Sequence, residues 1–305
     1  LNRVLARGAR GHDPAAGGVV STRHCRNDCG VAVAEGRSVT LVNTDSGQAA
    51  LQVRALAKSF GGVRAVRGVD FVVRAGEAVA LIGPNGAGKT TTFNLINGQI
   101  RPDQGEVWLD GRDITGMPPQ RLFRQGVART FQITATFGSM TVRENVQMAR
   151  MSHLRALTSL RHALGRRADR AEITHAYSLI AEQGLADQAN RPASELAYGD
   201  LKRLELAMAF ANDPRLLLMD EPTAGMAPGE REALMKHALA ACRERNVALL
   251  FTEHDMDVVF GFADRVIVMN RGRIIAEGTP DEIRSHEEVR AVYLGTAAPA
   301  EAAHA

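Results

Sequence analysis

The chain has 305 residues, of which 45% are hydrophobic and 23% are charged, and this balance excludes intrinsic disorder as its overall state. A net charge of +3 spread over this length is too weak to indicate nucleic-acid binding, and three cysteines make no disulfide framework. The longest apolar runs, such as residues 247–251, are much shorter than a membrane span, so we expect any work at a membrane to depend on other chains.

Residues 1–46 come first in chain order, and their Gly-, Ala- and Arg-rich sequence has no lasting hydrophobic periodicity. We predict a disordered tail there. Because position 1 is a leucine, one interpretation is that the tail is upstream sequence translated from a misassigned start. Cys25 and Cys29 lie in this tail, but no second pair of ligands is nearby, so we do not expect a zinc site.

From residue 47 onward the predicted elements alternate between strands and helices. Apolar or alternating runs predict strands at 51–56, 69–73, 78–82, 105–110, 216–219, 247–251, 265–269 and 273–277. Helical patterns predict helices at 90–97, 195–210, 230–245 and 257–262, and helical signals also fill 141–185. We therefore predict an α/β fold, a sheet with crossover helices, over residues 47–296. A helical subdomain is inserted at about 134–195, and residues 297–305 form a flexible C-terminal tail.

A glycine-rich loop follows the apolar run 78–82 and matches the phosphate-binding pattern G-x-x-x-x-G-K-[ST]. Glycines let backbone N–H groups surround phosphates, and the start of the next helix adds positive charge. We expect Lys89 to reach the β- and γ-phosphates and the Thr90 hydroxyl to bind Mg²⁺. The predicted nucleotide-binding residues are Gly83, Pro84, Asn85, Gly86, Ala87, Gly88, Lys89, Thr90 and Thr91.

A pair of carboxylates ends the apolar run 216–219. We expect Asp220 to hold Mg²⁺ and Glu221 to orient or activate an attacking water. An apolar run that ends in Asp-Glu is by itself equally typical of an ordinary strand end. Together with the glycine-rich loop, it predicts a nucleoside triphosphatase.

With these motifs in place, residues 51–295 resemble the ATP-binding subunit of an ABC transporter. Phe60 stands where the family has an aromatic residue that stacks on adenine, in a predicted loop after a strand. Gln132 matches the glutamine that contacts Mg²⁺ and couples the site to membrane subunits. His254 matches the histidine that contacts the γ-phosphate, and residues 222–226 resemble a loop at the dimer interface.

This resemblance implies a P-loop ATPase core with a mixed sheet, an antiparallel β subdomain and an inserted α-helical subdomain. It implies catalytic roles for Glu221, His254 and Gln132, and Mg²⁺ contacts for Thr90, Gln132 and Asp220. It also implies that ATP lies between two subunits, since the signature segment of one subunit completes the site of the other.

The signature segment departs from the family's usual Leu-Ser-Gly-Gly-Gln, because residues 196–200 read Leu-Ala-Tyr-Gly-Asp. Ala197 lacks the serine hydroxyl that would meet the γ-phosphate. Asp200 brings a carboxylate that would repel phosphate unless it caps the helix. The segment is still expected to contact nucleotide, through Ala197, Tyr198, Gly199 and Asp200.

The Leu-Ala-Tyr-Gly form and residues 277–295 resemble the branch that serves importers of branched-chain and other hydrophobic amino acids. This resemblance implies a peripheral ATPase on the cytoplasmic face of the inner membrane, with ATP and Mg²⁺ bound. The implied partners are a second ATPase subunit (a paralogue or a copy), two membrane permeases and, indirectly, a periplasmic solute-binding protein, with no nucleic acid.

Two alternatives remain open from the sequence. The first is the ATPase of a lipopolysaccharide-type lipid exporter, which shares much of this sequence pattern. The second is a soluble ABC ATPase without a permease, which the single phosphate loop and the absence of a heptad run disfavour.

Overall fold

A computed structural model describes residues 49–130, 136–153 and 170–294, all within one unit of the chain, Asp45–Ala305. Three parts of the chain named above therefore lie outside the described residues: the predicted tail at 1–46 with Cys25 and Cys29, the predicted tail at 297–305, and Gln132. No helix in the described ranges combines the length and apolar character needed to cross a membrane.

The first sheet has four antiparallel strands in the order β2-β1-β4-β5. Strands β1 (Ala49–Phe60) and β2 (Val63–Arg74) form a hairpin that turns at Gly61 and Gly62. Strands β4 (Gln104–Leu109) and β5 (Arg112–Asp113) follow on the other side of β1, joined by a turn at 110–111. This sheet confirms the strands predicted at 51–56, 69–73 and 105–110, and it is the expected antiparallel β subdomain.

The second sheet has six strands in the order β10-β9-β3-β8-β7-β6. Five are parallel, namely β9 (Arg265–Asn270), β3 (Ala78–Ile82), β8 (Ala248–Thr252), β7 (Leu216–Asp220) and β6 (Val127–Thr130). Strand β10 (Arg273–Gly278) runs antiparallel to β9, so the sheet is mixed, as expected. Every residue of β3, β7 and β8 is buried, which explains their unbroken apolar sequences.

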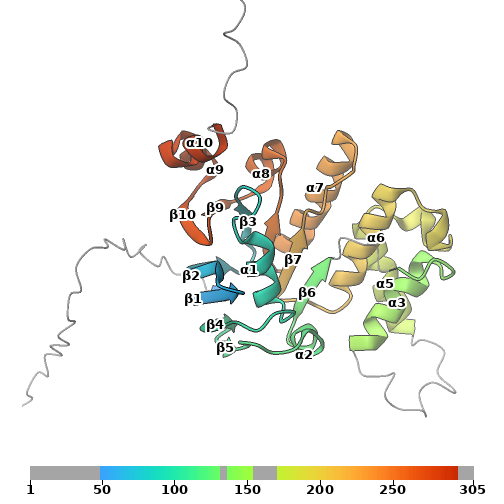
Figure 1. Cartoon of the computed structure of the whole chain (residues 1–305). Coiled ribbons are helices and arrows are strands. Elements are labelled where there is room, and N and C mark those ends of the chain that lie inside the picture. The colour runs from blue at the N-terminus through green and yellow to red at the C-terminus, as the bar shows by residue number, and fades with distance from the viewer. Residues whose placement is uncertain (1–48, 131–135, 154–169, 295–305) are drawn as a thin grey trace, which may run out of the picture. The chain divides into compact units, whose positions relative to one another are not determined.

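Helices and the first sheet cover the two faces of this mixed sheet (Figure 1). Successive residues of β3 alternate between two hydrophobic cores, because side chains of a strand point to opposite faces. One core includes residues of α1 (Lys89–Ile96) and of the antiparallel sheet. The other includes residues of α7 (Pro228–Glu244) and α8 (Met256–Phe262). The chain continues through α9 (Pro280–Ser285) and α10 (Glu287–Leu294).

The predicted helical insertion at about 134–195 contains α3 (Val142–His153) and α5 (Arg170–Glu182), which contact each other and also α6 (Tyr198–Phe210), the helix that follows the insertion. These helices lie together beyond the β6 edge of the mixed sheet, and α6 contacts β6 directly (Figure 1). The helix predicted from residue 195 begins three residues later, because a 3-10 turn occupies Ala193–Glu195. The sequence prediction missed β6, β5 and the short helix α2 (Pro119–Arg124).

Candidate nucleotide-binding and hydrolysis site

The glycine-rich loop connects β3 to α1 and packs closely against neighbouring strands. A Cβ atom at Gly83 would lie 2.2 Å from the Met269 carbonyl oxygen, and one at Gly88 would lie 2.4 Å from the Ala65 carbonyl oxygen. Gly88 also has φ of 102° at the start of α1. Only glycine fits at these two positions, so the packing of the loop against its neighbours by itself requires both glycines.

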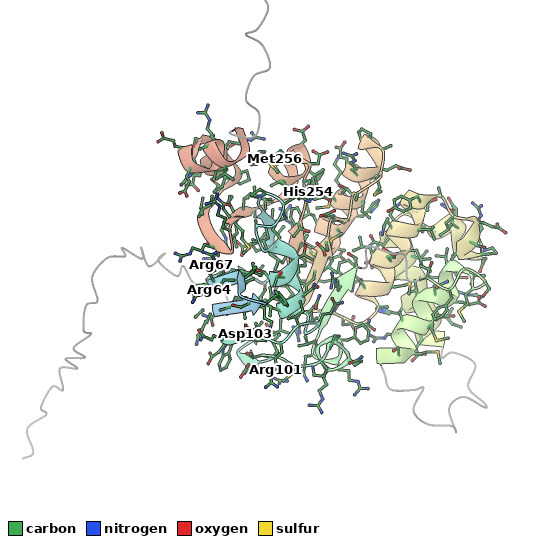
Figure 2. All side chains as sticks on the ribbon, viewed as in Figure 1. Arg64, Arg67, Arg101, Asp103, His254 and Met256 are labelled. Carbon is green, nitrogen blue, oxygen red and sulfur yellow. The ribbon has the colours of Figure 1, made fainter. Side chains whose placement is uncertain are left out.

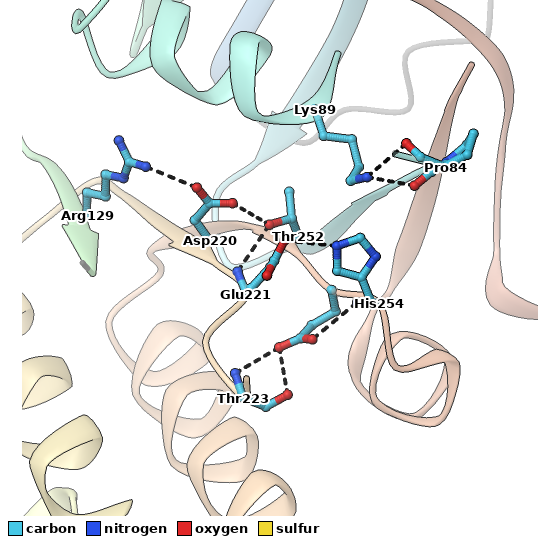
Figure 3. Close-up of polar contacts among 10 residues, drawn as sticks. Pro84, Lys89, Arg129, Asp220, Glu221, Thr223, Thr252 and His254 are labelled. Carbon is cyan, nitrogen blue, oxygen red and sulfur yellow. Dashed lines mark hydrogen bonds and ion pairs between the residues drawn. The ribbon is translucent and has the colours of Figure 1, made fainter. Parts of the chain in front are cut away.

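Lys89 holds this loop from inside (Figure 3). Its Nζ donates to the carbonyl oxygens of Gly83 at 2.6 Å and Pro84 at 3.2 Å. Burial lowers the pKa of Lys89, while the charges of Glu221 and Asp220 act in the opposite direction. The ammonium group therefore lies at the loop, where phosphate oxygens can replace the two carbonyl acceptors.

Asp220 is buried at the end of β7 and is oriented by two donors (Figure 3). Thr252 Oγ1, at the end of β8, donates to Asp220 Oδ1 at 2.7 Å. Arg129 Nη2, on β6, donates to Asp220 Oδ2 at 3.0 Å. Arg129 Nη1 also donates to Asn94 Oδ1 on α1 at 3.1 Å. These bonds fix the carboxylate between three strands and the helix that follows the phosphate loop.

Glu221 and His254 form a pair across the ends of β7 and β8. His254 Nε2 lies 2.9 Å from Glu221 Oε1 (Figure 3). The Glu221 backbone has φ of 49°, and its N–H lies 3.1 Å from both the Thr252 carbonyl oxygen and Thr252 Oγ1. The next loop is held by Glu253, whose carboxylate accepts from Thr223 N at 2.9 Å and Thr223 Oγ1 at 2.7 Å.

A cavity of about 470 Å³ brings together much of the predicted phosphate loop and two of the predicted catalytic residues. Its lining includes residues 85–91 of the phosphate loop and α1, together with Glu221 and His254. The remaining lining residues come from β2 and from the turn between β9 and β10; they are Val63, Arg64, Ala65, Arg67 and Arg271. A pocket of this size and composition suits a nucleotide.

The expected placement of Phe60 is wrong in one respect. Phe60 is the last residue of β1 rather than part of a loop, and its cross-strand partner Val63 lines the cavity in its place. The Phe60 ring is 46% exposed, and Lys58 Nζ lies 5.6 Å from its centre. The strand continues to Phe60 because residues 57–60 keep pairing with β2, a register that the short predicted strand did not include.

The oxygen ligands at this site fit Mg²⁺. The buried Asp220 carboxylate and the Thr90 hydroxyl are the donor types that this ion prefers. Within the described residues no group of three or more His, Cys, Asp or Glu side chains forms a metal cluster. Mg²⁺ is commonly bound by one or two protein carboxylates and completes its shell with water and substrate phosphates.

The signature segment begins α6 and does not line this cavity. Ala197 is the N-cap residue and makes no side-chain cap. Asp200 lies in the first turn; it is not a cap but pairs with Arg203 and accepts from Gln188 Nε2 at 2.7 Å. A neighbouring guanidinium therefore offsets its charge. Tyr198 Oη donates to the Ala224 carbonyl oxygen at 3.3 Å, which connects the segment to the 222–226 loop.

Several site residues carry no sequence signal of their own. Arg129 lies three positions before Gln132 and Thr252 two positions before His254, but only the structure shows both of them bound to Asp220. Arg64, Arg67 and Arg271 approach the phosphate loop from segments that no nucleotide motif includes.

The loop between a buried parallel strand and a helix, with Asp-Glu at the end of a neighbouring strand, defines a P-loop nucleoside triphosphatase. Residues 66–224 match the family described as "ABC transporter". Residues 273–299 match the family described as "Branched-chain amino acid ATP-binding cassette transporter". The chain belongs to the ABC transporter family, whose ATP-binding subunits couple ATP hydrolysis to transport.

Two bacterial relatives are similar over nearly their whole length. BraF of Pseudomonas aeruginosa is 42% identical over 251 residues, covering 81% of this chain and 98% of BraF. LivG of Salmonella typhimurium is 42% identical over 253 residues, covering 82% of this chain and 99% of LivG. Both are named high-affinity branched-chain amino acid transport ATP-binding proteins.

Solved structures confirm the predicted fold class. A nucleotide-free ATP-binding cassette from an ABC transporter is 32% identical with a TM-score of 0.70, covering 80% of this chain and 98% of that chain. The ADP conformation of MJ1267, an ATP-binding cassette of an ABC transporter, is 31% identical with a TM-score of 0.71, covering 81% of this chain and 99% of that chain.

Proposed function

We propose that this chain powers the import of branched-chain or other hydrophobic amino acids, or of related small solutes, through separate permeases. The observation that carries this proposal is its similarity to BraF and LivG, which extends over 98–99% of their lengths. The match of residues 273–299 to the branched-chain family supports the same substrate class.

The proposed assembly has two ATPase subunits, either two copies of this chain or this chain and a paralogue. They lie at the cytoplasmic face of the inner membrane beneath two permeases, which receive solute from a periplasmic binding protein. The signature residues Ala197, Tyr198, Gly199 and Asp200 of one subunit face the nucleotide of the other. Backbone N–H groups at the start of α6 replace the missing serine hydroxyl.

Within one subunit, ATP occupies the cavity beside the phosphate loop. Lys89 exchanges its two carbonyl acceptors for β- and γ-phosphate oxygens. Phe60 packs on the adenine from the hairpin beside Val63. Asp220, Thr90 and Gln132 hold Mg²⁺, which neutralises charge on the β- and γ-phosphates when it is bound.

Glu221 orients the attacking water as the general base. His254 fixes the Glu221 carboxylate through the 2.9 Å contact and reaches the γ-phosphate from its exposed side. Thr252 Oγ1 bonds both the backbone N–H of Glu221 and the side chain of Asp220. These two bonds fix the position of the proposed base relative to the proposed metal ligand.

The proposed catalytic role is tested with Glu221→Gln, which keeps the size of the side chain and removes its charge. We expect the variant to bind ATP with near wild-type affinity in calorimetry and to lose almost all hydrolysis. Lys89→Ala serves as the contrasting variant, because it should lose nucleotide binding itself. Wild-type hydrolysis by Glu221→Gln would remove this residue from the role of base.

The proposed transport role is tested by purifying the native membrane complex through this chain and identifying its partners. Two permeases and a solute-binding protein that binds leucine, isoleucine or valine in a ligand screen are the expected result. Recovery of a periplasmic lipid-bridge protein instead would favour the exporter and contradict the proposal.

A further inference from the structure

Three arginines, Arg64, Arg67 and Arg271, line the nucleotide cavity. Arg64 and Arg67 lie on β2, where Figure 2 labels both, and Arg271 lies in the turn between β9 and β10. All three are exposed and line the cavity. None forms an ion pair with another described residue; the one polar contact of their side chains is Arg67 Nε donating to the Arg64 carbonyl oxygen at 3.3 Å.

The backbone under these arginines is fixed to the phosphate loop. Arg67 N donates to the Gly272 carbonyl oxygen at 2.8 Å, and Gly272 N donates to the Ala87 carbonyl oxygen at 2.9 Å. The approach is close, because a Cβ atom at Gly272 would lie 2.7 Å from the Ala65 carbonyl oxygen. The segments that carry the three arginines are thus hydrogen-bonded to each other and to the phosphate loop.

The charges of the cavity lining are unbalanced. Lys89 and the three arginines face a single lining carboxylate, that of Glu221. The Lys89 ammonium is buried and bonded to the loop, whereas the arginines stand in solvent at the opening. Exposed charges of this kind contribute more to the rate of encounter than to the bound complex, because water weakens an exposed ion pair while the longer-range field still steers an approaching ligand at low salt.

We propose that Arg64, Arg67 and Arg271 form an electrostatic entrance that accelerates the association of nucleoside polyphosphates with the cavity. A charged cleft of this kind raises association rates by about 10- to 1,000-fold at low ionic strength. The effect acts on the multiply charged phosphate chain of the ligand and does not depend on which solute the transporter carries.

The test is stopped-flow binding of a fluorescent ATP analogue to the full chain over a range of salt concentrations. The triple variant Arg64→Gln, Arg67→Gln, Arg271→Gln should associate about tenfold more slowly at low salt, with an unchanged dissociation rate. In about 1 M salt the Debye length is only about 3 Å, so the rates of wild type and variant should converge.

Two matched variants complete the experiment. A control triple, Arg112→Gln, Arg121→Gln and Arg124→Gln, removes the same charge from exposed arginines outside the cavity lining and should leave association nearly unchanged. Replacing the three cavity arginines by lysine keeps the charge and should retain the wild-type rate. This second variant still tests the proposal if the glutamine variant folds poorly.

Three outcomes would overturn the proposal. The cavity variant could associate as fast as wild type at low salt, or the control triple could slow association equally. A change confined to the dissociation rate would assign the arginines to direct contact with bound nucleotide instead. None of these outcomes bears on whether the complex imports amino acids, so the two proposals fail separately.

Discussion

Arg129 is expected to stabilise the protein chiefly by neutralising Asp220. In the described part of the chain it is the one cation in ion-pair contact with this carboxylate, and the side chains are only 17% and 6% exposed. Arg129→Met keeps the approximate length of the side chain and leaves Asp220 with the Thr252 hydroxyl as its side-chain donor. Removing one partner of a buried ion pair costs about 3–5 kcal/mol, because the remaining charge is uncompensated.

We expect Arg129→Met to lower the free energy of unfolding by about 3 kcal/mol, the lower end of that range, since Asp220 keeps its hydrogen bond to the Thr252 hydroxyl and is slightly exposed. For an ATPase core of this size, 1 kcal/mol corresponds to about 2–4 °C in Tm, so the variant should melt roughly 6–12 °C lower. Urea and thermal unfolding of the nucleotide-free protein measure both quantities.

A double-mutant cycle separates the charge effect from lost packing. Asp220→Asn removes the carboxylate, and the double variant should be clearly more stable than the sum of the two single losses predicts, by about 1–3 kcal/mol. Arg121→Met on α2 is the exposed control and should change stability by less than about 0.5 kcal/mol. Additive losses, or a loss below about 1 kcal/mol for Arg129→Met, would refute the reasoning.

Three further predictions concern glycine packing, acid stability and thiol reactivity. Gly98 and Gly111 have nearly the same φ, 73° and 74°, so Gly98→Ala and Gly111→Ala impose similar backbone strain. A Cβ at Gly98 would lie 1.9 Å from a carbonyl oxygen, whereas a Cβ at Gly111 would have no atom within 4 Å. Denaturant unfolding should show about 1 kcal/mol lost at Gly111 and several times more at Gly98; equal losses would contradict the steric argument. Burial raises the Glu77 pKa, but hydrogen bonds and charge from Arg265 and Arg74 outweigh it and hold this pKa below its ordinary value of 4.5. As pH falls, Glu77 therefore takes up its proton in the unfolded chain before it does so in the folded one, so the free energy of unfolding of wild type should decrease below about pH 4.5. In Glu77→Gln, unfolding measured over the same pH range should show a smaller decrease. Burial raises the pKa of the Cys242 thiol to about 12, so peptide mass spectrometry should show slow alkylation at pH 8 in the native protein and fast alkylation in urea. Equal rates would show that this thiol is accessible.

The sequence predicted the parts of the fold whose signals are local. The buried strands β3, β7 and β8 read as unbroken apolar runs because both of their faces are covered. The phosphate loop follows from a fixed spacing of glycines, and Asp220 and Glu221 follow from their place at the end of an apolar run. These features need no knowledge of distant contacts.

Features that depend on distant partners were not predictable. Strand β6 has only four residues and contains the charged Arg129, so it lacks an apolar run, yet its pairing with β7 fixes it in the sheet. Arg129 and Asp220 are 91 positions apart, and no local sequence pattern predicts that they form a contact. The same reasoning applies to Arg271, which reaches the nucleotide cavity only because β9 lies beside β3.

At Glu221 the proposed catalytic role and folding stability favour different residues. A non-glycine residue with φ of 49° is strained by about 1–2 kcal/mol, and glycine at this position would relieve that strain. Folding stability alone would therefore favour Glu221→Gly, a substitution that relaxes the turn and deletes the proposed base. Selection for a more stable variant without selection for turnover should accumulate glycine at this position, so thermostability screens of this protein should always be paired with an activity screen.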